Sequence, residues 1–247
     1  MQKENELVVI TGASGGIGRE LAKAFSKKGY TVAMGDIRET VKGEAAKIAE
    51  RTKGRVGGFT VDVSDFGSCE KFFAEMLKWS GCDHVQVLVN NAGITRDSLF
   101  SKMSYEQWDT VMKVDLYGIF NCTKPVTEGM IKAGGGRIIN ISSISRLGNK
   151  GQANYSSAKA GIVGFTKTLA KELGRYNITS NAISPGLIDT EILRTIPEKL
   201  IQGFIEDIPM KRLGKPEEVA NLAVFLASEE AAYINGEVIN LNGGFFF

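Results

Sequence analysis

The stretch that decides the fold reads LVVITGASGGIG and spans residues 7–18. Its first four residues are branched apolar side chains without polar alternation, which is typical of a strand covered on both faces. Glycines at positions 12, 15, 16 and 18 follow, and a helical pattern begins at Arg19. A glycine turn between a strand and a helix lets a phosphate approach the backbone, where the helix offers unpaired N–H groups and its positive dipole end. The stretch therefore predicts an α/β fold with a phosphate site after its first strand.

The same alternation of strand and helix continues along the chain. Short apolar runs predict strands at 7–10, 31–34, 56–61, 85–89, 137–141, 178–183 and 237–241. Amphipathic segments predict helices that include 19–28, 68–79, 105–132, 153–175 and 216–227. Such alternation predicts a doubly wound, Rossmann-type α/β domain, in which helices cover both faces of a parallel sheet of about seven strands. No linker, repeat or charge block marks a second domain, so residues 1–247 are expected to form one domain.

Composition excludes several classes of protein. The chain has 29 Gly but only 5 Pro, where average usage gives about 17 and about 12, and this argues against a disordered or proline-rich linker. Its 30 Lys and Arg mix with 28 Asp and Glu, whereas a nucleic-acid site needs a clustered basic face. The first six residues carry acids that a signal peptide avoids, and no apolar run approaches the roughly 18 residues that cross a bilayer. We expect a cytoplasmic protein that binds neither nucleic acid nor membrane.

The cysteines and the single histidine predict no metal site. Cys69, Cys82 and Cys122 are odd in number and widely spaced, so they form neither a complete disulfide framework nor a C-x-x-C pair. We expect all three to be small buried residues. His84 lies two residues from Cys82, but two isolated ligands make a weak metal site, and a surface or loop role is expected instead.

A carboxylate stands at the end of the second predicted strand. Asp36 follows Gly18 by 18 residues, at the place where a dinucleotide-binding fold holds the adenosine ribose. A carboxylate accepts hydrogen bonds from the ribose hydroxyls and repels a 2′-phosphate, which favours NAD over NADP. Arg38 is a counter-signal because its charge suits a phosphate. The glycine turn and Asp36 together predict a dinucleotide site that prefers NAD(H), with NADP(H) less favoured.

Tyr155 is the tyrosine with a lysine four residues later, at Lys159. This spacing puts both side chains on one face of the predicted helix. A carbonyl that receives a hydride also needs a proton, and a phenol with a pKa near 10 needs a neighbouring positive charge to act near neutral pH. Pairs at this spacing are also common on solvated helices, so the spacing alone leaves both roles open.

Taken together, the motifs resemble the short-chain dehydrogenase/reductase family, and most closely its 3-oxoacyl-[acyl-carrier-protein] reductase and acetoacetyl-CoA reductase branch. The matching motifs occur in order over nearly the whole chain: Gly12-x-x-x-Gly16-x-Gly18, Asn90-Asn-Ala-Gly93, Tyr155-Ser-Ser-Ala-Lys159, Asn181-Ala-Ile-Ser-Pro185-Gly186 and Asn242-Gly-Gly244. The segment Gly93-Ile-Thr-Arg-Asp97 also matches the oxoacyl-thioester reductases.

The resemblance implies a full cofactor site. Asp62 and Val63 would flank the adenine, and Ile188 with Thr190 would meet the nicotinamide carboxamide. Relatives that use NADP tend to carry a basic residue where this chain has Gly15. The cofactor-binding residues implied are Gly12, Ser14, Gly15, Gly16, Ile17, Gly18, Asp36, Asp62, Val63, Asn90, Ala92, Gly93, Tyr155, Lys159, Pro185, Gly186, Ile188 and Thr190.

The resemblance also implies catalytic roles. Tyr155 is the acid and base, and Lys159 holds the nicotinamide ribose and favours the phenolate. A serine should donate a hydrogen bond to the substrate oxygen; counting back from Tyr155 selects Ser142, whereas counting from the preceding strand selects Ser143, which we prefer because loops lose residues more easily than strands. Asp115 stands where relatives have an asparagine that supports a proton relay, and it is expected either to serve that relay or to be structural.

The expected substrate is a 3-oxoacyl thioester, carried by acyl-carrier protein or by CoA. Relatives dock the carrier protein with basic residues at places that correspond to Gly134 and Tyr176 here, beside Lys132 and Arg175, so an acyl-CoA remains an open alternative. Residues 186–210 are the least regular stretch and are expected to be either a substrate lid or a plain surface insertion. Its apolar side chains would also suit a secondary alcohol: Leu187, Ile192, Leu193, Ile196 and Phe204.

Two further classes compete with a reductase. A regulator on the same fold would bind NAD without turnover, but it has no need of Tyr155 and Lys159. A sugar-nucleotide epimerase shares that pair but normally adds a second domain. The resemblance implies a homotetramer, with residues 105–132 and 153–175 paired across one interface and Phe245–Phe247 near another.

Overall fold

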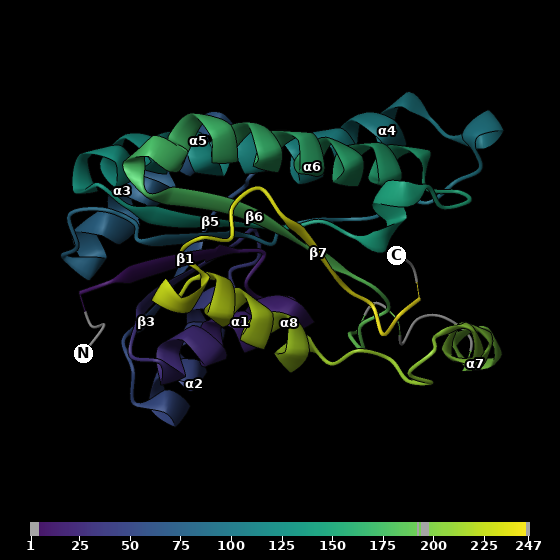
Figure 1. Ribbon diagram of the computed structural model, residues 1–247, viewed down its shortest axis with the longest axis horizontal. Coiled ribbons are helices and arrows are strands. Elements are labelled where there is room, and N and C mark those ends of the chain that lie inside the picture. The colour runs from purple at the N-terminus through teal and green to yellow at the C-terminus, as the bar shows by residue number, and fades with distance from the viewer. Residues whose placement is uncertain (1–4, 192, 194–197, 246–247) are drawn as a thin grey trace.

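Seven parallel strands form one sheet in the order β3-β2-β1-β4-β5-β6-β7 (Figure 1). The computed structural model describes residues 5–191, 193 and 198–245 of the chain. The strands are β1 (Leu7–Thr11), β2 (Thr31–Asp36), β3 (Val56–Thr60), β4 (Val87–Asn90), β5 (Gly136–Ile141), β6 (Ile178–Pro185) and β7 (Val238–Leu241). The chain reverses its direction of travel across the sheet between β1 and β4, and in such folds ligands bind at the carboxyl ends of the strands near this point. The predicted fold class is confirmed.

Helices cover both faces of the sheet. In Figure 1, α3, α5 and α6 lie on one side of the strands, and α1, α2 and α8 lie on the other. The helices are α1 (Gly16–Lys27), α2 (Val41–Thr52), α3 (Phe66–Ser80), α4 (Tyr105–Val111), α5 (Gly118–Ala133), α6 (Ala153–Leu173), α7 (Glu198–Asp207) and α8 (Pro216–Leu226). Among the described residues, no helix is both long enough and apolar enough to span a membrane.

The central strands supply two hydrophobic cores at once. Side chains alternate between the two faces of a strand, so Val8 and Ile10 of β1 belong to the core under α1, α2 and α8. Leu7 and Val9 belong to the core under α3 and α5. All four are fully buried. This is why the strand in the opening motif is apolar at every position rather than at every second one.

Residues 105–132 do not form the single helix that their periodicity predicts. A π-helical segment, Met112–Tyr117, separates α4 from α5. Each turn of π-helix holds more residues than a turn of α-helix, and here it leaves Asp115 fully buried while Lys113 stays exposed. The periodicity missed this segment because apolar side chains recur at similar intervals before and after it.

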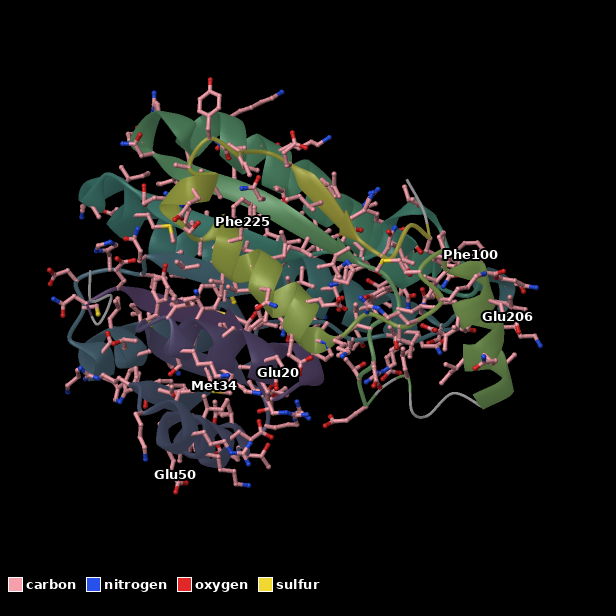
Figure 2. All side chains as sticks on the ribbon, turned by 60° about the horizontal axis from the view of Figure 1, so that its bottom comes forward. Glu20, Met34, Glu50, Phe100, Glu206 and Phe225 are labelled. Atoms are coloured by element: carbon pink, nitrogen blue, oxygen red, sulfur yellow. The ribbon has the colours of Figure 1, made fainter. Side chains whose placement is uncertain are left out.

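The stretch 186–210 is less irregular than the sequence predicts, because it contains α7. Phe100, in the loop after β4, and Glu206, on α7, lie at the same end of the molecule (Figure 2). Of the apolar residues expected in the lid, Ile192 and Ile196 lie outside the described residues, as do Phe246 and Phe247 at the C-terminus.

The cysteines only partly follow the prediction. Cys69 and Cys122 are buried, with their sulfurs 3.7 Å apart, but Cys82 is partly exposed. Cys82 lies just beyond the end of α3, where a turn leads toward β4 and offers less cover than the interior of a helix. His84 lies in the same turn, and its Nε2 forms a hydrogen bond of 3.0 Å with Gln86, which confirms its loop position.

Candidate functional site

The glycine turn lies against the segment that follows β4. Gly12 has a φ of +60°, and a Cβ there would stand 2.7 Å from the Cα of Ala92. A Cβ on Gly18 would stand 2.6 Å from the Cα of Ala13. Both neighbours are backbone atoms that cannot move aside cheaply. These glycines therefore allow the close approach of β1, α1 and the segment after β4.

Thr11 and Asn91 hold this approach together, and neither was among the predicted site residues. The Asn91 side-chain amide donates to the carbonyl oxygens of Thr11 (2.9 Å) and Gly12 (3.0 Å). In return, the Thr11 hydroxyl accepts hydrogen bonds from the backbone N–H groups of Asn91 (3.1 Å) and Ala92 (3.2 Å). Asn91 belongs to the Asn-Asn-Ala-Gly motif, so its position in that motif was the signal that could have identified it.

The turn has the properties that a dinucleotide pyrophosphate requires. Helix α1 begins at Gly16, its N-cap Gly15 supplies no side-chain cap, and no acidic side chain stands in its first turn. Its first N–H groups are therefore available to an anion. The Ser14 hydroxyl is buried and has no hydrogen-bond partner among the described residues. These residues fit the phosphates of a bound dinucleotide.

Asp36 ends β2 beside this turn and is already held by two neighbours. Its Oδ2 accepts from the Ser14 N–H at 2.9 Å, and its Oδ1 accepts from the Arg38 backbone N–H and Nε, each at 3.0 Å. Burial alone would raise the pKa of Asp36, but the hydrogen bonds from Arg38 and Ser14 outweigh it and hold that pKa below its usual value. The carboxylate is therefore ionised, and a half-exposed guanidinium lies over it.

The residues expected on the adenosine side of the site differ in where their polar groups are directed. Val63 lies next to α5, where its carbonyl accepts from the Asn121 side chain at 2.8 Å, while Asp62 accepts from Ser64. The Asn90 side chain does not face the turn; it donates to Asn140 (2.8 Å) in the interior. Asn90 can therefore line a cofactor only through its backbone.

The start of the stretch after β6 lies over the glycine turn. Gly186 packs against Asn242, and a Cβ there would stand 2.9 Å from the Asn242 Cα. Ile188 is buried and bridges to Gly214. The Thr190 methyl lies 3.2 Å from where a Cβ on Gly16 would stand. Of these predicted residues, Thr190 is the one that the contacts place against the glycine turn.

Helix α6 carries Tyr155 and Lys159 toward the end of β5. The Lys159 ammonium lies 5.3 Å from the centre of the Tyr155 ring and donates to the Ile141 carbonyl at 3.1 Å. Ser143 lies near enough to Tyr155 to lower the pKa of its phenol, and the Ser143 hydroxyl accepts from the Ser145 N–H at 3.1 Å. Ser142 instead points into the protein, where its hydroxyl donates to the Lys159 carbonyl at 2.9 Å. The geometry groups Ser143, not Ser142, with the tyrosine.

Asp115, on the π-helical segment, lies beside Lys159 in the same cluster. Its Oδ2 lies 3.1 Å from the Lys159 Nζ, and the two side chains are 0% and 3% exposed. Its Oδ1 accepts from the Ile94 N–H at 2.8 Å. Burial raises the pKa of Asp115, and Lys159 and Ile94 offset that only in part.

The pKa of Tyr155 is raised above its ordinary value, which is the opposite of the direction expected from a lysine alone. Burial is the largest cause; the positive charge of Lys159 lowers the pKa, but the negative charge of Asp115 raises it again. The sequence expectation missed this because it took account neither of the burial of the phenol nor of a carboxylate beside the lysine.

Asn154 is a further residue that the sequence did not single out. Its buried side-chain amide donates to the carbonyl oxygens of Arg96 and Gln107, each at 3.0 Å, and its Oδ1 accepts from the Tyr155 N–H at 2.8 Å. Asn154 therefore connects the start of α6 to the loop after β4 and fixes the position of the Tyr155 backbone. Its place immediately before Tyr155 was the available signal.

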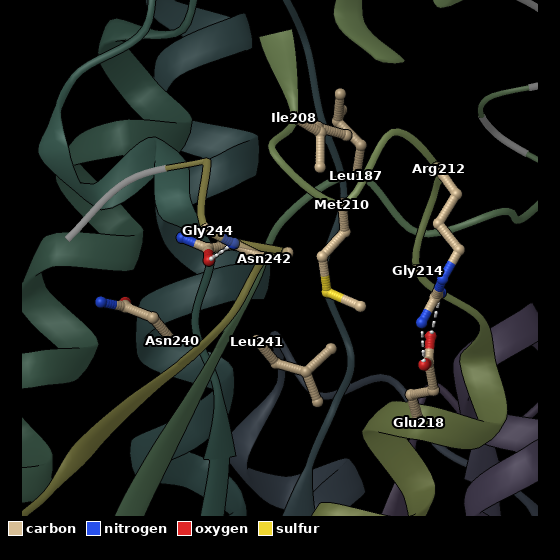
Figure 3. Close-up of a pocket in the computed structure, with 11 residues that line it drawn as sticks. Leu187, Ile208, Met210, Arg212, Gly214, Glu218, Asn240, Leu241, Asn242 and Gly244 are labelled. Atoms are coloured by element: carbon tan, nitrogen blue, oxygen red, sulfur yellow. Dashed lines mark hydrogen bonds and ion pairs between the residues drawn. The ribbon is translucent and has the colours of Figure 1, made fainter. Parts of the chain in front are cut away.

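A cavity of about 400 Å³ lies between the end of the 186–210 stretch, the start of α8 and the residues after β7. Figure 3 shows the Met210 side chain pointing toward Leu241 across it, and Arg212 paired with Glu218 at one side. Ser143, Tyr155 and Lys159 are not among its lining residues, which are Leu187, Ile208, Met210, Arg212, Gly214, Glu218, Asn240, Leu241, Asn242, Gly243 and Gly244.

Known proteins match the chain over nearly its whole length. Residues 12–246 match the model of a protein family described as enoyl-(acyl carrier protein) reductase. The chain is 43% identical over 245 residues to the 3-oxoacyl-[acyl-carrier-protein] reductase FabG of Thermotoga maritima, with 99% of both chains covered. It is 45% identical over 245 residues to the acetoacetyl-CoA reductase of Shinella zoogloeoides, with 98% of this chain and 99% of that protein covered. The chain therefore belongs to the short-chain dehydrogenase/reductase family of nicotinamide-dependent oxidoreductases.

Proposed function

We propose that this protein reduces the 3-oxo group of an acyl thioester to a 3-hydroxyacyl thioester. The observation that carries the proposal is the cluster of Ser143, Tyr155 and Lys159 near the end of β5, at the same carboxyl edge of the parallel strands as the glycine turn. Relatives named as 3-oxoacyl-[acyl-carrier-protein] reductase and acetoacetyl-CoA reductase support the choice of substrate.

Each residue of the cluster has one task. The reduced nicotinamide, when bound, supplies a hydride to the carbonyl carbon. Tyr155 gives its phenolic proton to the carbonyl oxygen, so that the C=O bond becomes CH–OH. Ser143 donates a hydrogen bond to the same oxygen, which stabilises the negative charge that develops there. Lys159 and Asn154 hold the tyrosine at its place on α6.

The cofactor that we propose is NAD(H) rather than NADP(H). Asp36 is ionised at the end of β2, and a carboxylate at that place accepts from ribose hydroxyls and repels a 2′-phosphate. Gly15 also leaves the turn without a basic side chain. The competing feature is Arg38, which lies on Asp36. A kcat/KM higher with NADPH than with NADH would overturn this part of the proposal.

The carrier of the acyl group is proposed to be CoA or acyl-carrier protein. At the places where relatives dock the carrier protein, this chain has Gly134 and Tyr176. The neighbouring Lys132 pairs with Glu128 at 2.7 Å, and the Arg175 guanidinium lies 4.7 Å from the centre of the Tyr176 ring. Both cations are therefore partly engaged, so we expect acyl-CoA to be turned over at least as well as the carrier-protein form.

We further propose a cytoplasmic homotetramer. Two exposed aromatic side chains, Phe66 of α3 and Phe120 of α5, have ring centres 6.4 Å apart, and Tyr117, which lies close to Phe120 in sequence, is more than half exposed. A second copy of the chain would cover such side chains. Light scattering that gives the mass of a monomer would contradict this assembly, and cell fractionation tests the location.

The central experiment follows the loss of NADH absorbance with acetoacetyl-CoA, with longer acyl-CoA substrates and with acyl-carrier-protein forms. We expect turnover by the native protein and a loss of at least about a hundredfold in Tyr155→Phe. Tyr105→Phe is a matched control, because Tyr105 is exposed on α4, and it should leave turnover unchanged. NADH binding without turnover of any carbonyl would support a sensor instead, and turnover of secondary alcohols alone would support a different dehydrogenase.

A further inference from the structure

Asp115 and Lys159 form an ion pair that is closed off from solvent on every side that the structure describes. Each partner has one more hydrogen bond: the Ile94 N–H donates to Asp115, and the Lys159 ammonium donates to the Ile141 carbonyl. Gly93 packs directly against both, because a Cβ there would stand 2.7 Å from the Asp115 Oδ2 and 3.1 Å from the Lys159 Nζ. The pair is thus built into the site by residues from four segments.

The pair has no net charge, whichever partner holds the shared proton. An isolated ammonium beside a phenol favours the phenolate, but a neutral pair acts on it only as a dipole. The groups that act on the Tyr155 phenol are Lys159 of α6, Asp115 of the π-helical segment, Ser143 at the end of β5 and Asp97 of the loop after β4. Asp97 adds a second negative charge. Around Tyr155, the one positive charge, on Lys159, therefore faces two negative charges, on Asp115 and Asp97, which both raise the pKa of the phenol.

We propose that Asp115 acts through Lys159 as a positioning residue that keeps the proton on Tyr155, and so extends toward alkaline pH the range over which carbonyl reduction runs. The inference rests on the proposed function, because it assigns the direction in which Tyr155 works. Reduction needs the protonated phenol, and the reverse oxidation needs the phenolate. Asp115 therefore moves both pH profiles upward, while the equilibrium between the two thioesters stays the same.

Asp115→Asn tests the inference with little change of shape. The amide keeps an oxygen that can accept from the Ile94 N–H but carries no charge, so the Lys159 charge acts on Tyr155 unopposed. We expect the alkaline limb of kcat/KM for reduction to move down by about one to two pH units, and the onset of 3-hydroxyacyl oxidation to move down with it. The matched control is Asp109→Asn, because Asp109 of α4 forms a partly exposed ion pair with Lys113 of the π-helical segment at 2.7 Å. It should move neither profile.

A second measurement needs no turnover. Ultraviolet titration of the phenolate in the native protein, minus the same titration in Tyr155→Phe, isolates the Tyr155 transition. The same difference taken in the Asp115→Asn background should show that transition at lower pH. If no acyl thioester is reduced, the proposed function fails, but this titration still tests the role of Asp115.

The inference is overturned if Asp115→Asn binds NADH and leaves both the alkaline limb and the Tyr155 titration where they are in the native protein. Should that variant not fold, Asp115→Ser keeps a hydroxyl acceptor near the Ile94 N–H and removes the charge. The same downward shift is expected from it, and an unchanged Tyr155 titration in a folded Asp115→Ser protein would equally refute the idea.

Discussion

Replacing Gly93 by alanine tests how tightly the buried ion pair is packed. The added methyl would stand 2.7 Å from Asp115 and 3.1 Å from Lys159, whereas ordinary contacts are 3.4–4 Å. Neither partner can retreat freely, because each also holds a backbone hydrogen bond. Overpacking of this kind costs about 1–3 kcal/mol. A chain of this size loses roughly 2–4 °C of melting temperature per kcal/mol, so Gly93→Ala should melt roughly 2–12 °C lower.

The assay is thermal unfolding followed by circular dichroism, and Gly43→Ala is the matched control. Gly43 lies within α2, where a Cβ would meet nothing within 4 Å. Alanine is the better helix former, so this variant should gain about 0.5–1 kcal/mol. The two substitutions add the same methyl and should move the unfolding midpoint in opposite directions. If Gly93→Ala unfolds at the native midpoint with unchanged kcat, the pair yields easily and the packing argument fails.

Three further predictions concern other parts of the chain. The pKa of Glu218 is lowered to about 2 by Arg212 and a backbone N–H, so the stability that this carboxylate contributes is present above its usual pKa of 4.5 and is lost as pH falls through about 2. Arg212→Ala should therefore lower the unfolding free energy near neutral pH but not near pH 2, and an equal loss at both would contradict the assignment. Asn90→Ala removes the 2.8 Å donor of the buried Asn140 oxygen and should cost about 1–3 kcal/mol in thermal unfolding, whereas a loss below about 0.5 kcal/mol would show that water takes its place. Arg38→Ala removes the cation that would offset repulsion between the β2 carboxylate and a 2′-phosphate, so fluorescence titration should show NADPH affinity falling more than NADH affinity; the reverse order would refute it.

The strands could be predicted because each one is recognisable from its own run of apolar residues. A strand that supplies two cores must be apolar on both faces, and Leu7–Thr11 shows this without any reference to the rest of the chain. The break of 105–132 into three segments could not be predicted in this way. The π-helical segment Met112–Tyr117 keeps a nearly helical spacing of apolar residues. Its position depends on the contact between Asp115 and Lys159, which are far apart in the sequence.

The choice between the two serines shows where counting along a sequence fails. Counting back from Tyr155 and counting forward from the preceding strand give different serines, because each count assumes that the loop has the family's usual length. In the structure, adjacent side chains at the end of β5 point to opposite sides. The Ser142 hydroxyl donates to the Lys159 carbonyl, whereas Ser143 acts on Tyr155 and lowers the pKa of its phenol. The role of Ser143 in the reaction stays a prediction, and Ser143→Ala against Ser142→Ala is the comparison that tests it.

The charge state of the site depends on contacts that no local pattern contains. The spacing of Tyr155 and Lys159 on one helix predicts that they lie together, and from this pair alone a lowered phenol pKa follows. Burial of the phenol reverses that direction, and Asp115 raises the pKa further although it lies far away in the sequence, on a segment whose irregularity was not predicted. It reaches Lys159 only because Gly93 has no side chain to stand between them. The tyrosine and lysine that mark the family therefore do not by themselves set the proton affinity of the site, since burial and a third residue, brought in by the fold, both oppose the effect of the lysine charge.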